Sequence, residues 1–295
     1  MSAWTLLVST PPHREGDLGH AVPWLGVAPA EVNGRINFPA PEIWAADTDR
    51  RHVEEVAQTL SQAGLRTVLL DGARLLDVPA QSPVMSFSFA ETKLVAGLGH
   101  ATVTFEYEQP LTAVFCLPKD WGAPEMPMSQ SAQHRMVEGL QKRQSAVFMT
   151  RDSLVGLGGF ARRASMAGVP GVAGGPSFVD LYAVQNGAPL RVSFIQDVVD
   201  FGGLGDLKLP RSADNVAMFM AECESRFRAA RVDRRLTNLA PRPRPMVVVT
   251  SSPDAPGELG YRTEPLTQVL ESVSPSLKDI NPFDLASRLT DLTLQ

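Results

Sequence analysis

The residue types that most often carry chemistry are scattered along this chain of 295 residues. The five histidines are His13, His20, His52, His100 and His134. No two of them stand at the spacing of metal ligands on a predicted helix or hairpin, so we expect surface histidines and no metal site. The two cysteines, Cys116 and Cys223, lie in apolar stretches, which favours buried, inert thiols over a disulfide or an activated thiolate.

Asp197 and Asp200 are the two carboxylates that could divide the work of a general acid and a general base. Aspartates beside strand ends and glycines, as here, usually stabilise turns instead. The Gly-x-Ser-x-Gly motif of serine hydrolases does not occur in the chain. We therefore assign no catalytic residue, and the sequence gives no support for an enzyme.

Residues 118–176 form a long segment rich in Gly, Pro, Ser and Met. This segment contains a short run of residues that suggests a nucleotide-binding site. Residues 156–161, Gly-Leu-Gly-Gly-Phe-Ala, have the letters of a dinucleotide fingerprint. A true fingerprint joins a strand directly to a helix within a βαβ unit, whereas a Gly-Pro loop and a hairpin follow here. We expect no bound cofactor and interpret this insert as a functional or disordered loop. The alternative is a nucleotide-binding protein or an enzyme that uses these glycines.

Arginines gather at the end of a predicted helix over 212–229 and just beyond it. Cations at this position complement the negative end of the helix dipole, so we favour a structural role for them. The candidate residues for binding an anionic ligand are Arg228, Arg231, Arg234 and Arg235. The formal net charge of −5 argues against a protein that binds nucleic acid through a broad basic surface. Attachment to an anionic membrane through these arginines is a weaker alternative.

The elements of the first 75 residues alternate between strands and helices. Apolar strands are predicted at 4–8, 42–46 and 66–70, with two short helices between the first two strands. The clearest helix is predicted at 49–63, because Val53, Val56 and Leu60 recur at helical spacing and Asp47 or Thr48 precedes them as the N-cap. Gly64 supplies the left-handed residue that ends this helix.

This order of elements resembles the C-terminal domain of the bacterial ribosomal stalk protein. The matching text is Leu-Gly-Val at 25–27, Ala-Glu at 30–31, Pro41, and Leu-Ser-Gln-Ala-Gly-Leu at 60–65. The resemblance covers about a quarter of the chain and implies a βααβαβ plait over residues 1–78. Where the stalk domain carries lysines for binding translation factors, this chain has Val-Ala-Pro-Ala at 27–30, so that function is not implied.

Short strands dominate the region that begins at residue 79. Alternating or continuous apolar residues predict four strands within 84–117 and three within 178–201. Asn186-Gly187 predicts a tight hairpin, because both residues accept a positive φ. A helix over 212–229 follows, with a wide apolar face. We expect the two groups of strands to close into one barrel-like core that this helix caps.

The order of these elements resembles that of pleckstrin-homology-like domains, which have four strands, then three strands, then a helix. The run Phe-Ala-Glu-Thr-Lys-Leu-Val at 89–95 resembles the first hairpin of that family. In the family this hairpin often carries basic residues that hold lipid phosphates, whereas here it offers Glu91 and only Lys93. The resemblance therefore implies a protein-binding or self-assembling use of the fold, and lipid binding is not expected.

The composition changes again after a Pro-rich linker, and we treat 239–295 as a tail with short amphipathic helices. Such helices are too short to be stable alone, so they either pack back onto the body or dock on a partner or another copy. The candidate docking residues are Leu266, Val269, Leu270, Phe283, Leu285 and Leu289.

Taken together, the sequence predicts an α+β protein with a plait at 1–78, a pleckstrin-homology-like domain at 79–238 with the insert 118–176, and the tail 239–295. Residues 1–10 lack the pattern of a signal peptide, and no run of about 18 apolar residues occurs. We expect a cytoplasmic, bacterial-type scaffold or adaptor that binds a protein partner or itself.

Overall fold

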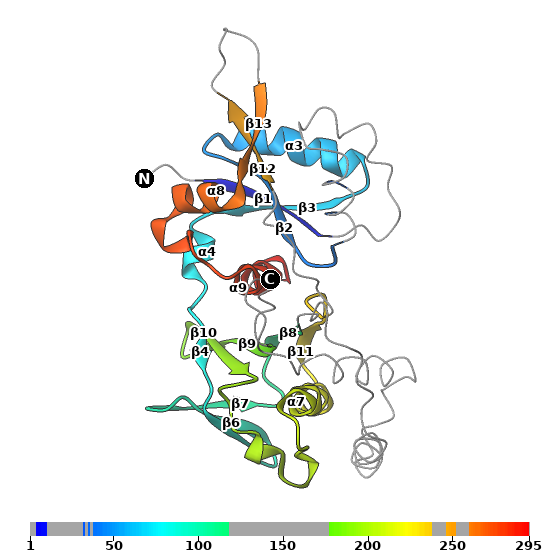
Figure 1. Cartoon of the computed structure of the whole chain (residues 1–295), viewed down its shortest axis with the longest axis vertical. Helices are drawn as coiled ribbons and strands as arrows, with labels where there is room; N and C mark the ends of the chain where they lie inside the picture. Colours follow the sequence, from blue (N-terminus) through cyan, green and yellow to red (C-terminus); the bar gives the residue numbers. More distant parts are fainter. Residues whose placement is uncertain are drawn as a thin grey trace. The chain divides into compact units, whose positions relative to one another are not determined.

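A computed structural model describes residues 4–10, 32, 35, 38–117, 177–237, 246–251 and 260–294 (Figure 1). The chain divides into two compact units, the first made of 1–78 with 242–295 and the second of 79–241. Both units combine helices with sheets, which confirms the α+β class. Among the described residues, no helix is both long enough and apolar enough to cross a membrane.

The first unit is built on a mixed sheet in the order β13-β12-β2-β1-β3. Strand β1 runs antiparallel to its neighbours β2 and β3, and the central strand, β2, runs parallel to β12 on its other side. The chain's last third therefore extends a sheet that its first residues begin. The strands are β1 (Thr5–Thr10), β2 (Glu42–Asp47), β3 (Arg66–Asp71), β12 (Met246–Ser251) and β13 (Gly260–Pro265).

Helix α3 (Arg50–Gln62) packs on this sheet, as its apolar spacing predicted. The N-cap is Asp49 and not the expected Asp47 or Thr48, because the Asp49 carboxylate accepts a hydrogen bond from the Arg51 backbone N–H at 3.0 Å. Gly64 follows with φ of 92°, the left-handed stop that was expected. The two short helices expected before β2 lie largely outside the described residues, where only Val32 and Arg35 are seen, both helical.

The C-terminal helices α8 (Leu266–Val273) and α9 (Pro282–Leu294) belong to the first unit, with the short η3 (Pro275–Leu277) between them. Helix α8 packs against β12 and β13, while α9 contacts α4 (Arg74–Asp77). Arg288 of α9 donates Nη1 hydrogen bonds to the carbonyls of Leu75 and Val78. We expected a separate tail at 239–295; of its two alternatives, the structure has the one in which the helices pack back.

The described residues of the second unit form two sheets. Strands β5 (Ser86–Phe89), β6 (Lys93–Gly97) and β7 (Thr102–Glu106) form an antiparallel meander. The larger sheet has the order β11-β8-β9-β10-β4. Asn186 and Gly187 make the predicted hairpin turn with φ of 52° and 78°. The strands of the larger sheet are β4 (Ser82–Pro83), β8 (Leu111–Cys116), β9 (Phe178–Gln185), β10 (Ala188–Ile195) and β11 (Ala230–Asp233).

The prediction that these strands close into one barrel is wrong for the part of the chain that the structure describes. Strand β8 does not continue the meander, because its two edges are taken by β9 and β11. The two groups of strands nevertheless share one core, which helix α7 (Ser212–Arg226) completes. Its aromatic centre includes Phe87, Phe105, Phe115, Phe194 and Phe219.

A last strand expected at 197–201 is also absent from the structure as described. Apart from a single bridge between Ser86 and Asp200, the chain makes turns and then the 3-10 helix η2 (Phe201–Leu207). This helix packs along β5 so closely that a Cβ on Gly203 would stand 2.0 Å from the Phe87 carbonyl oxygen. Glycine is therefore required at this contact.

Candidate functional site

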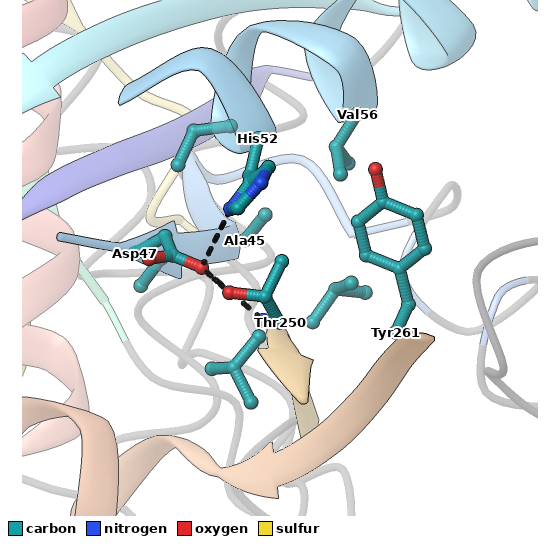
Figure 2. Close-up of a pocket in the computed structure, with 10 residues that line it drawn as sticks. Ala45, Asp47, His52, Val56, Thr250 and Tyr261 are labelled. Atoms are coloured by element: carbon teal, nitrogen blue, oxygen red, sulfur yellow. Dashed lines mark hydrogen bonds and ion pairs between the residues drawn. The ribbon is translucent and has the colours of Figure 1, made fainter. Parts of the chain in front are cut away.

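A small pocket in the first unit gathers polar side chains from four separate segments (Figure 2). Asp47 comes from the end of β2, His52 from the first turn of α3, Thr250 from β12 and Tyr261 from β13. Figure 2 shows Asp47, His52 and Thr250 pointing toward one another. Apolar residues complete the lining: Ala45, Ala46, Val53, Val56, Val248 and Val249.

Asp47 is the centre of this polar group. Its Oδ2 accepts hydrogen bonds from the hydroxyl and from the backbone N–H of Thr250. The other oxygen, Oδ1, accepts from the backbone N–H of Asp49 at 2.9 Å. His52 places Nδ1 at 3.7 Å from Asp47 Oδ2 and Nε2 at 3.7 Å from a carboxylate oxygen of Asp49. The histidine thus lies between two carboxylates, at ion-pair distance rather than hydrogen-bond distance.

Tyr261 links the same hairpin to helix α3. Its hydroxyl donates a hydrogen bond to Glu55 Oε2 at 3.1 Å. Burial, followed by this hydrogen bond and the nearby carboxylates of Glu55 and Asp47, raises the pKa of Tyr261 to about 12. The phenol therefore stays neutral at physiological pH and acts as a hydrogen-bond donor.

The pocket is small. Only about 10 Å³ within it is wide enough to admit the centre of a water molecule. Sites for organic ligands usually measure roughly 300–1,000 Å³, so this one does not fit a nucleotide or a similar cofactor. Thr250 is engaged as a donor to Asp47, and none of the described lining residues carries a thiol or an amine. The arrangement ties β12 and β13 to β2 and α3, which is a structural task.

The structure also places the predicted candidates for catalysis that fall on described residues. Asp200 caps η2 by accepting from the Gly202 N–H at 2.9 Å, and Lys208 lies 3.2 Å away; both interactions lower the pKa of Asp200. Cys116 and Cys223 are buried, and burial raises the pKa of both thiols well above the usual value. In the described ranges, no three His, Cys, Asp or Glu residues are grouped to hold a metal ion.

The predicted arginine cluster lies in and around β11, an edge strand of the larger sheet as the structure describes it. Strand β11 pairs with β8 and with no other described strand. Arg228 and Arg231 are exposed here. Val232, the residue after Arg231 in β11, is 38% exposed. We call these three residues the basic edge.

The other two candidate arginines are engaged within the unit. Arg234 donates from Nε and Nη2 to the two oxygens of the Glu224 carboxylate. Arg235 donates from Nε to Asp233 at 2.7 Å. The four predicted anion-binding residues thus differ in exposure: Arg228 and Arg231 are exposed, whereas Arg234 and Arg235 are partly buried.

The six predicted docking residues of the C-terminal helices are all buried within the protein. They are therefore not exposed to a partner in this structure. The glycine run at 156–161, together with His13, His20 and His134, lies outside the described residues.

Sequence reasoning did not find the pocket in the first unit. Asp47 and Thr250 are 203 positions apart in the chain, and none of the pocket's polar residues belongs to a recognisable motif. Comparisons of the chain with protein-family models, with curated proteins and with solved structures found no match.

Proposed function

We propose that this protein is a non-enzymatic interaction or assembly module, and that the basic edge of the second unit is its contact surface. The observation that carries the proposal is an apolar side chain on an open strand edge. Val232 exposes 38% of its surface on β11, whose outer edge no described strand occupies. Open edges are sites where another chain can add a strand, and proteins usually protect them.

The expected bacterial-type, cytoplasmic scaffold with a pleckstrin-homology-like second unit remains part of this proposal. A meander, further strands and a helix around one core support the resemblance to that family. In such an arrangement the strand edges and loops are free to bind partners while the core stays intact. The proposal assigns the protein no cofactor and no catalytic residue.

The test uses a photo-crosslinking amino acid, benzoylphenylalanine, placed at position 232 of the full chain and irradiated in intact cells. Val184 is the matched control position, because it is a more exposed valine, at 70%, in the same sheet. It lies on β9, whose two edges are both paired. We expect a discrete crosslinked product from position 232 and none from position 184. Equal products from both positions, or none from position 232, would contradict the proposal.

A further inference from the structure

The turn between β9 and β10 places an asparagine directly before a glycine at the surface of the second unit. Asn186 and Gly187 are both exposed, and a Cβ built on Gly187 would meet no atom within 4 Å. Gln185 pairs with Ala188, so these two residues form the whole connection between the strands. In such a turn the closing hydrogen bond joins the two flanking residues. The backbone nitrogen of Gly187 is therefore uncrowded and lies outside the ladder.

The carboxamide of Asn186 is free to turn toward this nitrogen, as a comparison with Asn215 shows. Asn215 is 3% exposed, and its carboxamide is held at both ends: Oδ1 accepts from the Leu209 backbone N–H at 2.6 Å, and Nδ2 donates to the Leu209 carbonyl at 2.9 Å. Within the described part of the chain, no residue holds the Asn186 carboxamide in this way. The two asparagines of the second unit thus have opposite environments.

The backbone of the turn can also make the required movement. Asn186 has φ of 52°, a left-handed conformation that is unfavourable for a residue with a Cβ. Rotation of the backbone between Asn186 and Gly187 brings the Gly187 nitrogen to the side-chain carbon of Asn186 and releases this strain. Because both residues are exposed, the rotation opens the turn locally and leaves the packed core intact.

We infer that Asn186 is a site of spontaneous covalent modification, in which the chain deamidates itself. The Gly187 nitrogen attacks Asn186 Cγ and forms a C–N bond, and the bond from Cγ to the side-chain nitrogen breaks. Ammonia leaves with the proton that the Gly187 nitrogen gives up, and a cyclic succinimide remains. Water then adds to either of the two ring carbonyls and breaks the C–N bond there, which yields aspartate or isoaspartate. Water is the only co-reactant.

Either product changes the hairpin. Both introduce a negative charge, and isoaspartate also lengthens the backbone by one carbon, so the connection no longer matches the pairing of Gln185 with Ala188. Gln185 Nε2 donates to the carbonyl of Thr104 in β7 at 2.6 Å and so joins the hairpin to the meander. The modification should therefore loosen the contact between the two sheets as the molecule ages. It is independent of the proposed contact surface at the basic edge.

The test incubates the full chain at physiological temperature and pH in water enriched in heavy oxygen, followed by trypsin digestion and mass spectrometry. Trypsin cleaves after Lys and Arg, so Asn186 falls in peptide 164–191 and Asn215 in peptide 212–226, each as the only asparagine. The chain's other Asn-Gly pair, 33–34, falls in peptide 15–35. We expect peptide 164–191 to incorporate heavy oxygen about tenfold or more faster than peptide 212–226, and to separate into aspartate and isoaspartate forms. Equal rates, or an unchanged Asn186, would overturn the inference.

The matched variant is Asn186→Gly, which keeps a residue that the turn accepts and removes the carboxamide. Amide hydrogen exchange at 185–188 is compared in fresh and aged samples of both proteins. We expect faster exchange only in the aged unmodified protein. A similar increase in the aged variant would show that ageing loosens the hairpin by another route and would overturn the inference. Modification of Asn186 without faster exchange would overturn the expected loosening.

Discussion

Arg191 and Asp180 of the second unit form a charged pair that is buried away from water. Arg191 donates from Nη2 to Asp180 Oδ2 at 2.5 Å, and Ser193 donates to the other oxygen at 2.5 Å. Both charged side chains are fully buried on neighbouring strands of the larger sheet. Transfer of two charges from water is costly, and the pair is stable only because each partner compensates the other.

Asp180→Ala should therefore destabilise the second unit by about 3–5 kcal/mol, since it leaves the Arg191 cation buried without its carboxylate. The measurement is urea unfolding followed by circular dichroism. The midpoints can be compared directly when the unfolding free energies of the variants depend equally steeply on urea concentration. Lys208→Ala is the control, because it removes an exposed ion pair with Asp200 in the same unit and should leave the midpoint almost unchanged. A similar midpoint for both variants would contradict the assignment of a buried charge pair.

Tyr261 links stability to alkaline pH in the first unit. Its pKa of about 12 in the folded protein exceeds the ordinary value of 10.0. Between these two values the unfolded chain loses the phenolic proton while the folded chain keeps it, so ionisation favours the unfolded state. The stabilisation is thus complete below pH 10 and decreases as the pH rises toward 12. Below pH 10 it includes the hydrogen bond to Glu55, worth about 1 kcal/mol.

We expect Tyr261→Phe to be less stable than the unmodified protein at neutral pH and to lose less of its stability above pH 10. The measurement is the unfolding free energy of the first unit over this pH range, with absorbance at 295 nm to follow the phenol. Tyr107→Phe is the control, since Tyr107 lies in the second unit. Parallel pH profiles for the Tyr261 variant and the unmodified protein would show that the hydroxyl is not held as described.

At the scale of elements, the C-terminal helices are structural members of the first unit. Leu289 of α9 is 1% exposed, so Leu289→Ala should cost about 2–5 kcal/mol of stability through lost burial and a cavity. Leu76→Ala in neighbouring α4 is the control, because that side chain is 46% exposed and its truncation should cost less than about 1 kcal/mol. Thermal unfolding of the first unit measures both. An unchanged transition for Leu289→Ala, with a loss of self-association instead, would restore the docking role first expected for this residue.

The elements that could be predicted from the sequence are those whose signals are local. Helix α3 has its apolar spacing and Gly64 within one short segment, and the β9–β10 hairpin has Asn186-Gly187 between two apolar runs. Strands β11 and β13 were missed because Ala-Arg-Val-Asp is too short for its alternation to stand out, and Gly-Tyr-Arg-Thr-Glu-Pro has only one large apolar side chain. Each becomes a strand because it pairs with an adjacent strand, β11 with β8 and β13 with β12.

Long-range pairing explains the remaining errors. The predicted barrel required β8 to stay with the meander, but its register is with β9, beyond a long intervening segment. The pocket at Asp47 depends on a contact with Thr250 from the far end of the chain. The arginine cluster could be found because its members are close in sequence. Which of them face solvent depends on Glu224 and Asp233, and only the fold shows this.

At the scale of the whole molecule, the two units differ in the number of chain segments that build them. The second unit, 79–241, is continuous and contains a core to which both sheets and α7 contribute. The first unit is discontinuous, because the pairing of β12 with β2 joins segments from both ends of the chain. Its sheet also needs α8, which packs against β12 and β13.

The expected consequence is that the fragment 79–241 folds alone whereas the fragment 1–78 does not. The isolated second unit should unfold cooperatively in urea, at the midpoint that the full chain shows for its corresponding transition. Fragment 1–78 should give the circular dichroism spectrum of an unfolded chain, because the surface that β12 and α8 cover would face water. Addition of the separate fragment 242–295 should restore helical and strand signals at equimolar concentration. A folded 1–78 fragment that gains nothing from 242–295 would refute this division of the molecule.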